Sequence, residues 1–297
     1  MKISLLLVTS SLAVATGIRP LPVISLTSAG QSKEKKSLDV KANVLGIPRG
    51  GANIGSVEPQ TLVKAFCALA MVQGLVMNTG PKISNEQYGI TGKANDSSAQ
   101  YQASQFGSGV ISISTLLYLL NFKGKSLAQA NKAVYAICGY QQLRSWLSGA
   151  AAEQGSESGA KAGLAICVFG FLAMSQDWWD TALKALSVAL ALSGVQMIVD
   201  PEGTKKTWKS ETAKLTPTSS LLLGLNGWYL LAQSAINLSM LFKGASPLEA
   251  AGYNAAVWAI SHGYNVVTGK FKSLGMPDNP QIAWCLMHAV IAYAALA

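Results

Sequence analysis

The chain has 297 residues, of which 50% are hydrophobic and only 12% are charged, whereas soluble domains carry about a quarter of charged residues. With a mean hydropathy of +0.30, this composition disfavours a disordered chain and an ordinary water-soluble enzyme. The net charge is +9, but residues 1–50 hold seven basic side chains against two acidic ones. The remaining chain has no basic stripe of the kind that nucleic-acid-binding proteins present, so we expect no nucleic-acid partner.

The first residues have the three parts of a secretory signal peptide. Met1-Lys2 supplies a positive charge, Ile3–Val14 is apolar, and Ala13-Val14-Ala15 offers small residues at the spacing that signal peptidase prefers. The apolar stretch is too short to cross a bilayer comfortably. We therefore predict a signal peptide over residues 1–15.

Residues 16–57 are rich in Ser, Thr, Pro and Lys and lack hydrophobic periodicity, which predicts a disordered leader with a possible transit region. The signal peptide and this tract together resemble the bipartite presequences of proteins in algae with secondary red plastids, such as diatoms. The run Ile47–Ala52 is also similar to sequences from that group. The resemblance implies a plastid location, in the thylakoid or the envelope. Thr16-Gly17-Ile18 lacks the aromatic residue usual after the cleavage site, so the endomembrane system is the alternative.

Eight apolar segments without strand-like alternation follow the leader, and several approach the roughly 20 residues that a helix needs to cross a bilayer. Their Gly, Ser and Ala content suits close helix packing within a membrane. We predict an all-α, polytopic membrane protein with about eight transmembrane helices. The expected spans are 60–78, 106–122, 128–148, 161–175, 180–199, 218–242, 248–268 and 280–297.

The segments repeat along the chain. The pattern from Gly107 to Ser126 recurs from Gly227 to Ser246, at a constant offset of 120 residues. Further matches extend over the other segments: Val72-Gln73 with Val195-Gln196, Ala133–Ile137 with Ala256–Ile260, and Ala165-Ile166-Cys167 with Ala283-Trp284-Cys285. These matches predict two tandem four-helix units, over residues 58–176 and 177–297.

An even number of crossings in each unit makes the two copies parallel and puts both ends of the chain on one side of the membrane. The longer connections carry more lysine than the short turns, which favours placing them in the cytosol or stroma. They cover residues 78–105, 149–160, 200–217 and 269–279. A soluble helical bundle is the alternative, because the third segment of each unit carries several polar and charged side chains.

The two histidines, His262 and His288, lie in neighbouring segments of the second unit. Neutral imidazole is a common axial ligand, so this pair is our candidate cofactor-binding site for a haem, a chlorophyll or a metal, with the identity of the cofactor unknown. The first unit has Gly139 and Gly170 at the aligned positions. The alternative is therefore that the histidines only fill space.

Polar side chains inside predicted membrane spans are candidates for a substrate pathway. This set consists of Gln73, Gln196, Gln233 and Asn237. The alternative role for each is a hydrogen bond between helices.

Sequence motifs for catalysis are absent: there is no phosphate-binding loop, no serine elbow and no zinc-protease helix. The four cysteines (Cys67, Cys138, Cys167 and Cys285) are spread singly over apolar runs, so we expect no metal site. We predict a non-enzymatic membrane protein with a structural, assembly or interaction role, whose partners are the lipid bilayer and other membrane proteins. The alternatives are a small-molecule carrier with a site between the two repeats and a pigment- or haem-binding subunit.

Overall fold

The chain is helical throughout the part that the structure, a computed structural model, describes: residues 57–208, 210, 213 and 215–297. These residues form α-helices and two short 3₁₀-helices and contain no β-strand. The all-α prediction is therefore confirmed. The predictions for the signal peptide and the leader fall on residues 1–56, outside the described part of the chain.

Each of the eight apolar segments forms one long helix. These helices are α3 (Pro59–Thr79), α5 (Ser97–Phe122), α6 (Leu127–Leu147), α8 (Glu157–Ala173), α9 (Trp179–Val199), α11 (Pro217–Lys243), α12 (Pro247–Val267) and α13 (Asp278–Leu296). Shorter helices lie in the connections, namely α4 (Pro81–Gln87), η1 (Gly92–Ala94), α7 (Ala150–Glu153), α10 (Pro201–Thr207) and η2 (Lys272–Leu274). The predicted ends agree within four residues, except that α5 begins nine residues before the predicted position. The Asp96 side chain accepts a hydrogen bond from the Ala99 amide at 2.7 Å and so starts α5 within a polar stretch.

Helices α6 and α12 start in the same way. In each, a serine caps the first turn and the residue three positions later completes a capping box: Ser126 with Gln129, and Ser246 with Glu249. A glycine with positive φ, Gly124 or Gly244, lies two residues before the cap. The short turns that reverse the chain before these helices are thus encoded locally.

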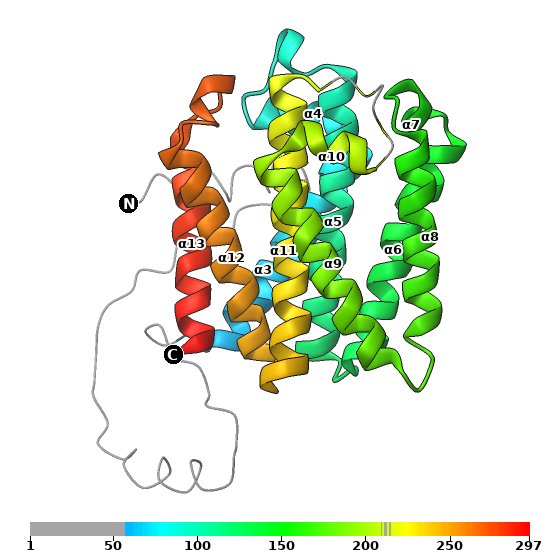
Figure 1. The fold of residues 1–297 in the computed structure, drawn as a ribbon. Helices are drawn as coiled ribbons and strands as arrows, with labels where there is room; N and C mark the ends of the chain where they lie inside the picture. The colour runs from blue at the N-terminus through cyan, green and yellow to red at the C-terminus, as the bar shows by residue number, and fades with distance from the viewer. Residues whose placement is uncertain (1–56, 209, 211–212, 214) are drawn as a thin grey trace, which may run out of the picture. The chain divides into compact units, whose positions relative to one another are not determined.

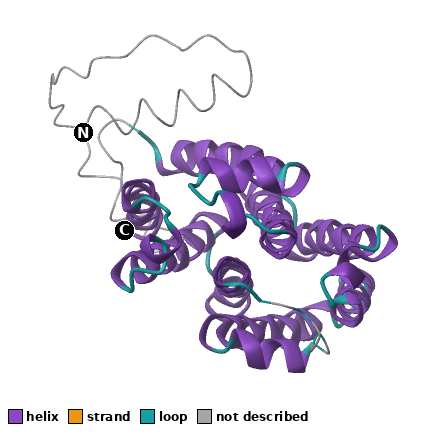
Figure 2. Ribbon diagram, turned by 90° about the horizontal axis from the view of Figure 1, so that it is seen from above, coloured by secondary structure: helices purple, strands orange, loops and turns teal. Residues whose placement is uncertain are grey.

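The long helices alternate in direction (Figure 1), with α4, α7, α10 and η2 gathered at one end, which we call the long-loop end. The connections at residues 123–126, 174–178 and 244–246 lie at the opposite, short-turn end. Helix α3 packs on α5, α9 on α11, α6 on α8, and α12 on α13, while α5 and α11 pack against each other. Figure 2 shows these helices nearly end-on. The described residues from 57 to 297 form one compact unit.

Glycines allow two of these pairs to approach very closely. A Cβ atom added at Gly107 of α5 would lie 2.7 Å from the Gly74 carbonyl oxygen of α3. A Cβ atom at Gly227 of α11 would lie 2.5 Å from the Gly194 carbonyl oxygen of α9. Real Cβ atoms do not approach oxygens this closely, so both helix crossings require glycine.

Apolar side chains are directed outward to an unusual degree. Three described helices, α3, α5 and α9, are long and apolar enough to cross a membrane, and α9 is the most apolar of them. Only 22% of the apolar stretch of α9 is buried. Conversely, Asn131, Asn237 and Asn254 are 0% exposed. Soluble proteins place these residue types the other way round.

Candidate functional site

Two of the predicted site groups meet in one cavity. A space of about 80 Å³ between α3, α5, α11, α12 and α13 is lined by His262, His288 and Gln73, and we call it the histidine cavity. The two imidazole rings stack with centroids 5.5 Å apart and an angle of 21° between their planes. The sequence therefore located the pair on neighbouring helices, and the structure brings the rings into contact.

The orientation of each imidazole ring is set by a hydrogen bond at Nδ1. His288 Nδ1 lies 2.7 Å from the Trp284 carbonyl oxygen, and His262 Nδ1 lies 3.1 Å from Gln281 Oε1. A carbonyl oxygen only accepts, so both Nδ1 atoms donate, and in the neutral ring Nε2 is left as the acceptor. Phe66 also packs edge-on against His288, with ring centroids 5.1 Å apart. Hydrogen bonds and aromatic packing together hold both rings in place.

The geometry of the histidine cavity does not suit a large cofactor. Axial ligands of one iron direct their nitrogen atoms at the metal from opposite sides, whereas these two rings stack nearly parallel. A cavity of about 80 Å³ is also too small for a porphyrin macrocycle. Within the described residues, no three His, Cys, Asp or Glu side chains are grouped to hold a metal ion. The arrangement favours the space-filling interpretation of His262 and His288.

Gln73 reaches a tyrosine beyond the end of its own helix. Its Nε2 donates a hydrogen bond to the Tyr88 hydroxyl oxygen, and Tyr88 directly follows α4. Burial raises the pKa of the Tyr88 hydroxyl above its ordinary value, because the charged form is poorly solvated there. The hydroxyl is therefore neutral, and the pair closes the histidine cavity toward the long-loop end.

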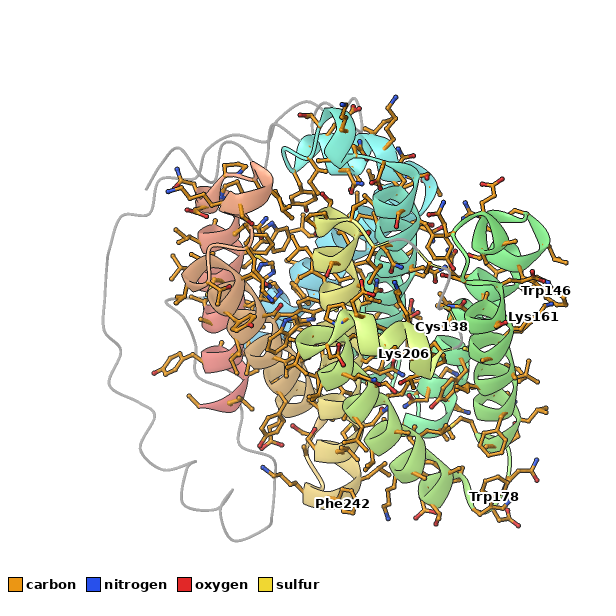
Figure 3. All side chains as sticks on the ribbon, turned by 45° about the horizontal axis from the view of Figure 1, so that its top comes forward. Cys138, Trp146, Lys161, Trp178, Lys206 and Phe242 are labelled. Carbon is orange, nitrogen blue, oxygen red and sulfur yellow. The ribbon has the colours of Figure 1, made fainter. Side chains whose placement is uncertain are left out.

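A second and larger cavity lies between α5, α6, α8, α9, α10 and α11. Its volume is about 250 Å³, and Cys138, labelled in Figure 3, lines it together with Lys205 of α10. Side-chain amides from three helices reach its wall, so we call it the glutamine cavity. These amides belong to Gln102, Gln105, Gln141, Gln142, Asn226 and Gln233.

Most of these amides satisfy one another or nearby hydroxyls. Gln142 Nε2 donates to Gln105 Oε1 at 3.1 Å, and Gln105 Nε2 donates to Ser145 Oγ at 2.9 Å. Gln233 is different: it is 2% exposed, and its amide makes no hydrogen bond to any residue in the described ranges. Tyr135 and Trp208 also line the cavity, and neither the buried Tyr135 hydroxyl nor the buried Trp208 indole nitrogen has a partner in the part of the chain that the structure describes. Three residues that line the cavity therefore carry polar groups that form no hydrogen bond with other described residues.

The other two predicted pathway residues line neither cavity. Gln196 Nε2 donates to Thr207 Oγ1 of α10 at 2.8 Å. Asn237 Oδ1 accepts a hydrogen bond from Asn131 Nδ2 at 2.9 Å, and Asn237 Nδ2 donates one to Ser187 Oγ at 3.1 Å. The Asn237 side chain therefore connects its helix to two others by hydrogen bonds. The four polar residues thus occupy separate places and do not form one pathway.

The spacing of the helices explains why Gln73 and Gln196 have different surroundings. Helix α9 begins and ends 120 residues after α3, and α10 begins and ends 120 residues after α4. The match of Val72-Gln73 with Val195-Gln196 needs an offset of 123, three residues more than the offset between these helices. At an offset of 120, Gln73 corresponds to Ser193, and the two glutamines are not at equivalent positions.

Sequence reasoning missed Tyr135 and Trp208 as cavity residues. Tyr135 lies within the run that matches the Trp258 region of the second unit, and Trp258 lines the histidine cavity. That match is the feature of the sequence that could have indicated Tyr135 as a cavity residue. Trp208 follows α10 in a connection without periodicity, so no pattern in the sequence marks it.

Comparison of the chain with protein-family models, with curated proteins and with solved structures found no match. The features of the chain that bear on its function are therefore the two cavities and the distribution of polar and apolar side chains. Of the two cavities, only the glutamine cavity combines volume with unpaired polar groups.

Proposed function

We propose that the chain is a non-enzymatic integral membrane protein that crosses the bilayer with its eight long helices and has a structural, assembly or interaction role. The observation that carries this proposal is the inverted polarity of the bundle: α9 is the most apolar candidate span, yet only 22% of its apolar stretch is buried. A 21-residue helix is about 32 Å long, which matches the roughly 30 Å hydrocarbon core of a bilayer. Lipid, or another membrane protein, covers such a surface without cost.

Lysine and aromatic side chains near the helix ends support this proposal. At the short-turn end, Lys184 lies over the Phe242 ring with its Nζ 5.4 Å from the ring centroid, and three similar pairs lie at that end. At the long-loop end, Lys161 lies over Trp146 at 5.2 Å. Figure 3 labels Phe242 and Trp178 at one end and Trp146 with Lys161 toward the other. Such belts are typical of the two membrane interfaces, where lysine extends its charge toward water.

We further propose that the eight helices form two tandem, parallel four-helix units, over residues 58–176 and 177–297. The 120-residue offset between α3 and α9 and between α4 and α10 supports a duplication. So do the glycine crossings, because Gly74 with Gly107 and Gly194 with Gly227 are related by the same offset. A parallel repeat of an even number of crossings places the four long connections on one side of the membrane.

The proposed location follows from the leader. Its resemblance to bipartite algal presequences supports a plastid membrane, thylakoid or envelope, and the endomembrane system is the alternative. In either place the outward apolar faces of α8 and α9 offer area to lipids and to other membrane proteins. Leu172 and Leu192 lie on these faces and are exposed.

Alkaline carbonate extraction tests the membrane proposal. Membranes from cells that express the full chain are washed at high pH and sedimented, because this treatment releases proteins held only by polar contacts. We expect the chain in the pellet, and in the supernatant only after detergent is added. A peripheral protein of the same membrane serves as the control that must be released. Recovery of the intact chain in the detergent-free supernatant would contradict the proposal.

A second candidate function is a small-molecule carrier with its site between the two units. The specific observation in its favour is the glutamine cavity, which has walls from both proposed units and the unpaired Gln233 amide. Binding sites between helices of a bundle commonly take this form. The stacked histidines do not add support to the third possibility, a pigment-binding subunit.

A further inference from the structure

We infer that the glutamine cavity binds an uncharged, largely apolar molecule that carries a carbonyl oxygen. This inference goes beyond the structural role and deepens the carrier alternative, on which it rests. Its basis is the combination of wall chemistry, unpaired donors and charge in the cavity.

Apolar side chains make up most of the wall. These apolar side chains include Ile166, Leu190, Leu223 and Leu230, which come from three different helices. A volume of about 250 Å³ is just below the usual range for drug-sized ligands, roughly 300–1,000 Å³. The occupant is therefore a small molecule with an apolar body.

The unpaired groups of the cavity wall can donate hydrogen bonds, so a ligand that pairs with them needs an acceptor atom. The Trp208 indole nitrogen can only donate, and the Tyr135 hydroxyl, on a residue 4% exposed, has a hydrogen to donate; neither has a partner among the described residues. The Gln233 amide adds further donors on a residue 2% exposed. Trp208 packs beside Gly159 and Tyr135 beside Gly170, eleven residues further along α8, so these two donors lie at different places on the wall. A carbonyl oxygen accepts two hydrogen bonds, so a ligand that carries one can pair with the Gln233 amide or with one of the other two donors.

Charge on the ligand is disfavoured by the lining. Lys205 is the one charged side chain among the described lining residues, and its Nζ lies 2.7 Å from Glu202 Oε2. This ion pair neutralises the lysine, and no carboxylate from the described residues lines the cavity to receive a cation. An ionised ligand would lose its hydration without gaining a counter-charge.

The repeat shows why this cavity is open. Ile166 stands where the second unit has Trp284, and Gly170 stands where it has His288. Those two rings line the histidine cavity and leave it with about 80 Å³. The Tyr135 ring fills the space beside Gly170, and Ile166, which is smaller than Trp284, lines the glutamine cavity of about 250 Å³. The substitution Ile166→Trp, which introduces the residue found at the matching position of the second unit, should therefore fill the glutamine cavity.

Four probes with ten-carbon chains test the ligand class: 2-decanone, decane, decanoate and decylammonium. The full chain, purified in detergent, is unfolded by heat at saturating probe while circular dichroism follows helix content. We expect 2-decanone to raise the midpoint by roughly 5 °C, because a ligand that binds only the folded state stabilises it. The other three probes are expected to leave the midpoint at the value of a detergent-only control.

Matched variants locate the binding. Ile166→Trp is expected to abolish the shift, whereas Val168→Trp, on the same helix but 51% exposed, is expected to keep it. Gln233→Leu removes one hydrogen-bonding group at similar volume, so we expect about a tenfold loss of affinity for 2-decanone. Gln73→Leu alters the histidine cavity instead and is expected to leave the affinity unchanged.

Four outcomes overturn the inference: no shift with 2-decanone, equal shifts with all four probes, a shift with decanoate alone, or a ketone shift that survives both Ile166→Trp and Gln233→Leu. If Ile166→Trp fails to fold, Gln233→Leu decides the question by itself. Failure here is distinct from failure of the membrane proposal. A chain that stays in the carbonate pellet but does not respond to 2-decanone refutes only the ligand, and a carbonate-soluble chain refutes the membrane location.

Discussion

Buried asparagines show how the pairing of one side-chain amide differs between two helices. Asn131 Nδ2 donates to Asn237 Oδ1 at 2.9 Å and to the Leu127 carbonyl oxygen at 3.0 Å, while Asn131 Oδ1 has no partner among the described residues. Asn254 lies 123 residues later, at the offset of the match between Ala133–Ile137 and Ala256–Ile260, and neither of its buried side-chain polar atoms has a partner among the described residues. The position that matches Asn237 in the first half is Leu117. The loss of that one partner accounts for the unpaired amide.

Replacing Asn254 and Asn131 should therefore have opposite effects. We expect Asn254→Leu to raise the free energy of unfolding by about 1 kcal/mol, because it removes two buried unpaired atoms. Asn131→Leu should lower it by about 1–3 kcal/mol, since it leaves Asn237 Oδ1 without its donor. Thermal unfolding followed by circular dichroism in detergent measures both. A loss of stability in Asn254→Leu as large as that in Asn131→Leu would contradict the argument.

At the level of side chains, the sequence predicted the helix on which a residue lies better than the contacts that its side chain makes. The positions of His262 and His288 on neighbouring helices followed from hydrophobic segments alone. Their stacking did not, because it depends on the hydrogen bond from His262 to Gln281 and on the packing of Phe66, which lie on other helices. Rotamers and partners of this kind are set by tertiary contacts, and no spacing in the chain encodes them.

At the scale of helices, glycine determines how closely elements approach. The α9–α11 crossing places the Gly194 carbonyl oxygen 2.5 Å from the position of a Cβ atom on Gly227. Gly224 lies on the same helix, one turn earlier, and the nearest atom to its added Cβ is the Met197 carbonyl oxygen at 4.0 Å. These two glycines form a matched pair that differs only in the space available.

Alanine at these two positions should separate packing from helix propensity. We expect Gly227→Ala to lower the free energy of unfolding by about 1–3 kcal/mol, because the helices must move apart. Gly224→Ala should be neutral or stabilising by up to about 1 kcal/mol, since alanine favours helix. Thermal unfolding of both variants in the same detergent measures the difference. Equal stability of the two would mean that the crossing tolerates a methyl group and that glycine is not required there.

Helices were the most predictable level of the fold. Hydrophobic runs of 15 to 25 residues bounded by capping serines, such as Ser126 and Ser246, specify where α6 and α12 begin. The short helices α4, α7 and α10 were not predicted, because four to seven residues carry too little periodicity. Helix α5 was predicted to be too short because its first turns are polar, and only the Asp96 cap reveals the start.

At the scale of the whole bundle, the two ends differ in the length of their connections. The long-loop end holds α4, α7, α10 and η2, whereas the short-turn end holds three brief turns. Charge does not distinguish the two ends clearly, because basic and acidic side chains occur at both. In the proposed membrane topology, the arrangement of the helices predicts that all long connections share one face of the membrane and all short turns share the other.

Cysteine labelling in sealed membrane vesicles tests that sidedness. Single cysteines are placed at exposed positions of both ends, and a membrane-impermeant maleimide is added before or after lysis. The long-loop set is Lys93→Cys, Glu153→Cys and Lys272→Cys, and the short-turn set is Lys125→Cys, Asp177→Cys and Lys243→Cys. The unmodified chain, with its four native cysteines, gives the background.

We expect one set to react in intact vesicles and the other only after lysis, because eight antiparallel helices of bilayer length bring every second connection to the same side. Which set reacts first depends on the orientation of the vesicles and fixes the orientation of the protein. A mixed response within either set would require at least one long helix to lie in the membrane plane or outside it. That result would break the alternation seen in Figure 1 and, with it, the two-unit topology.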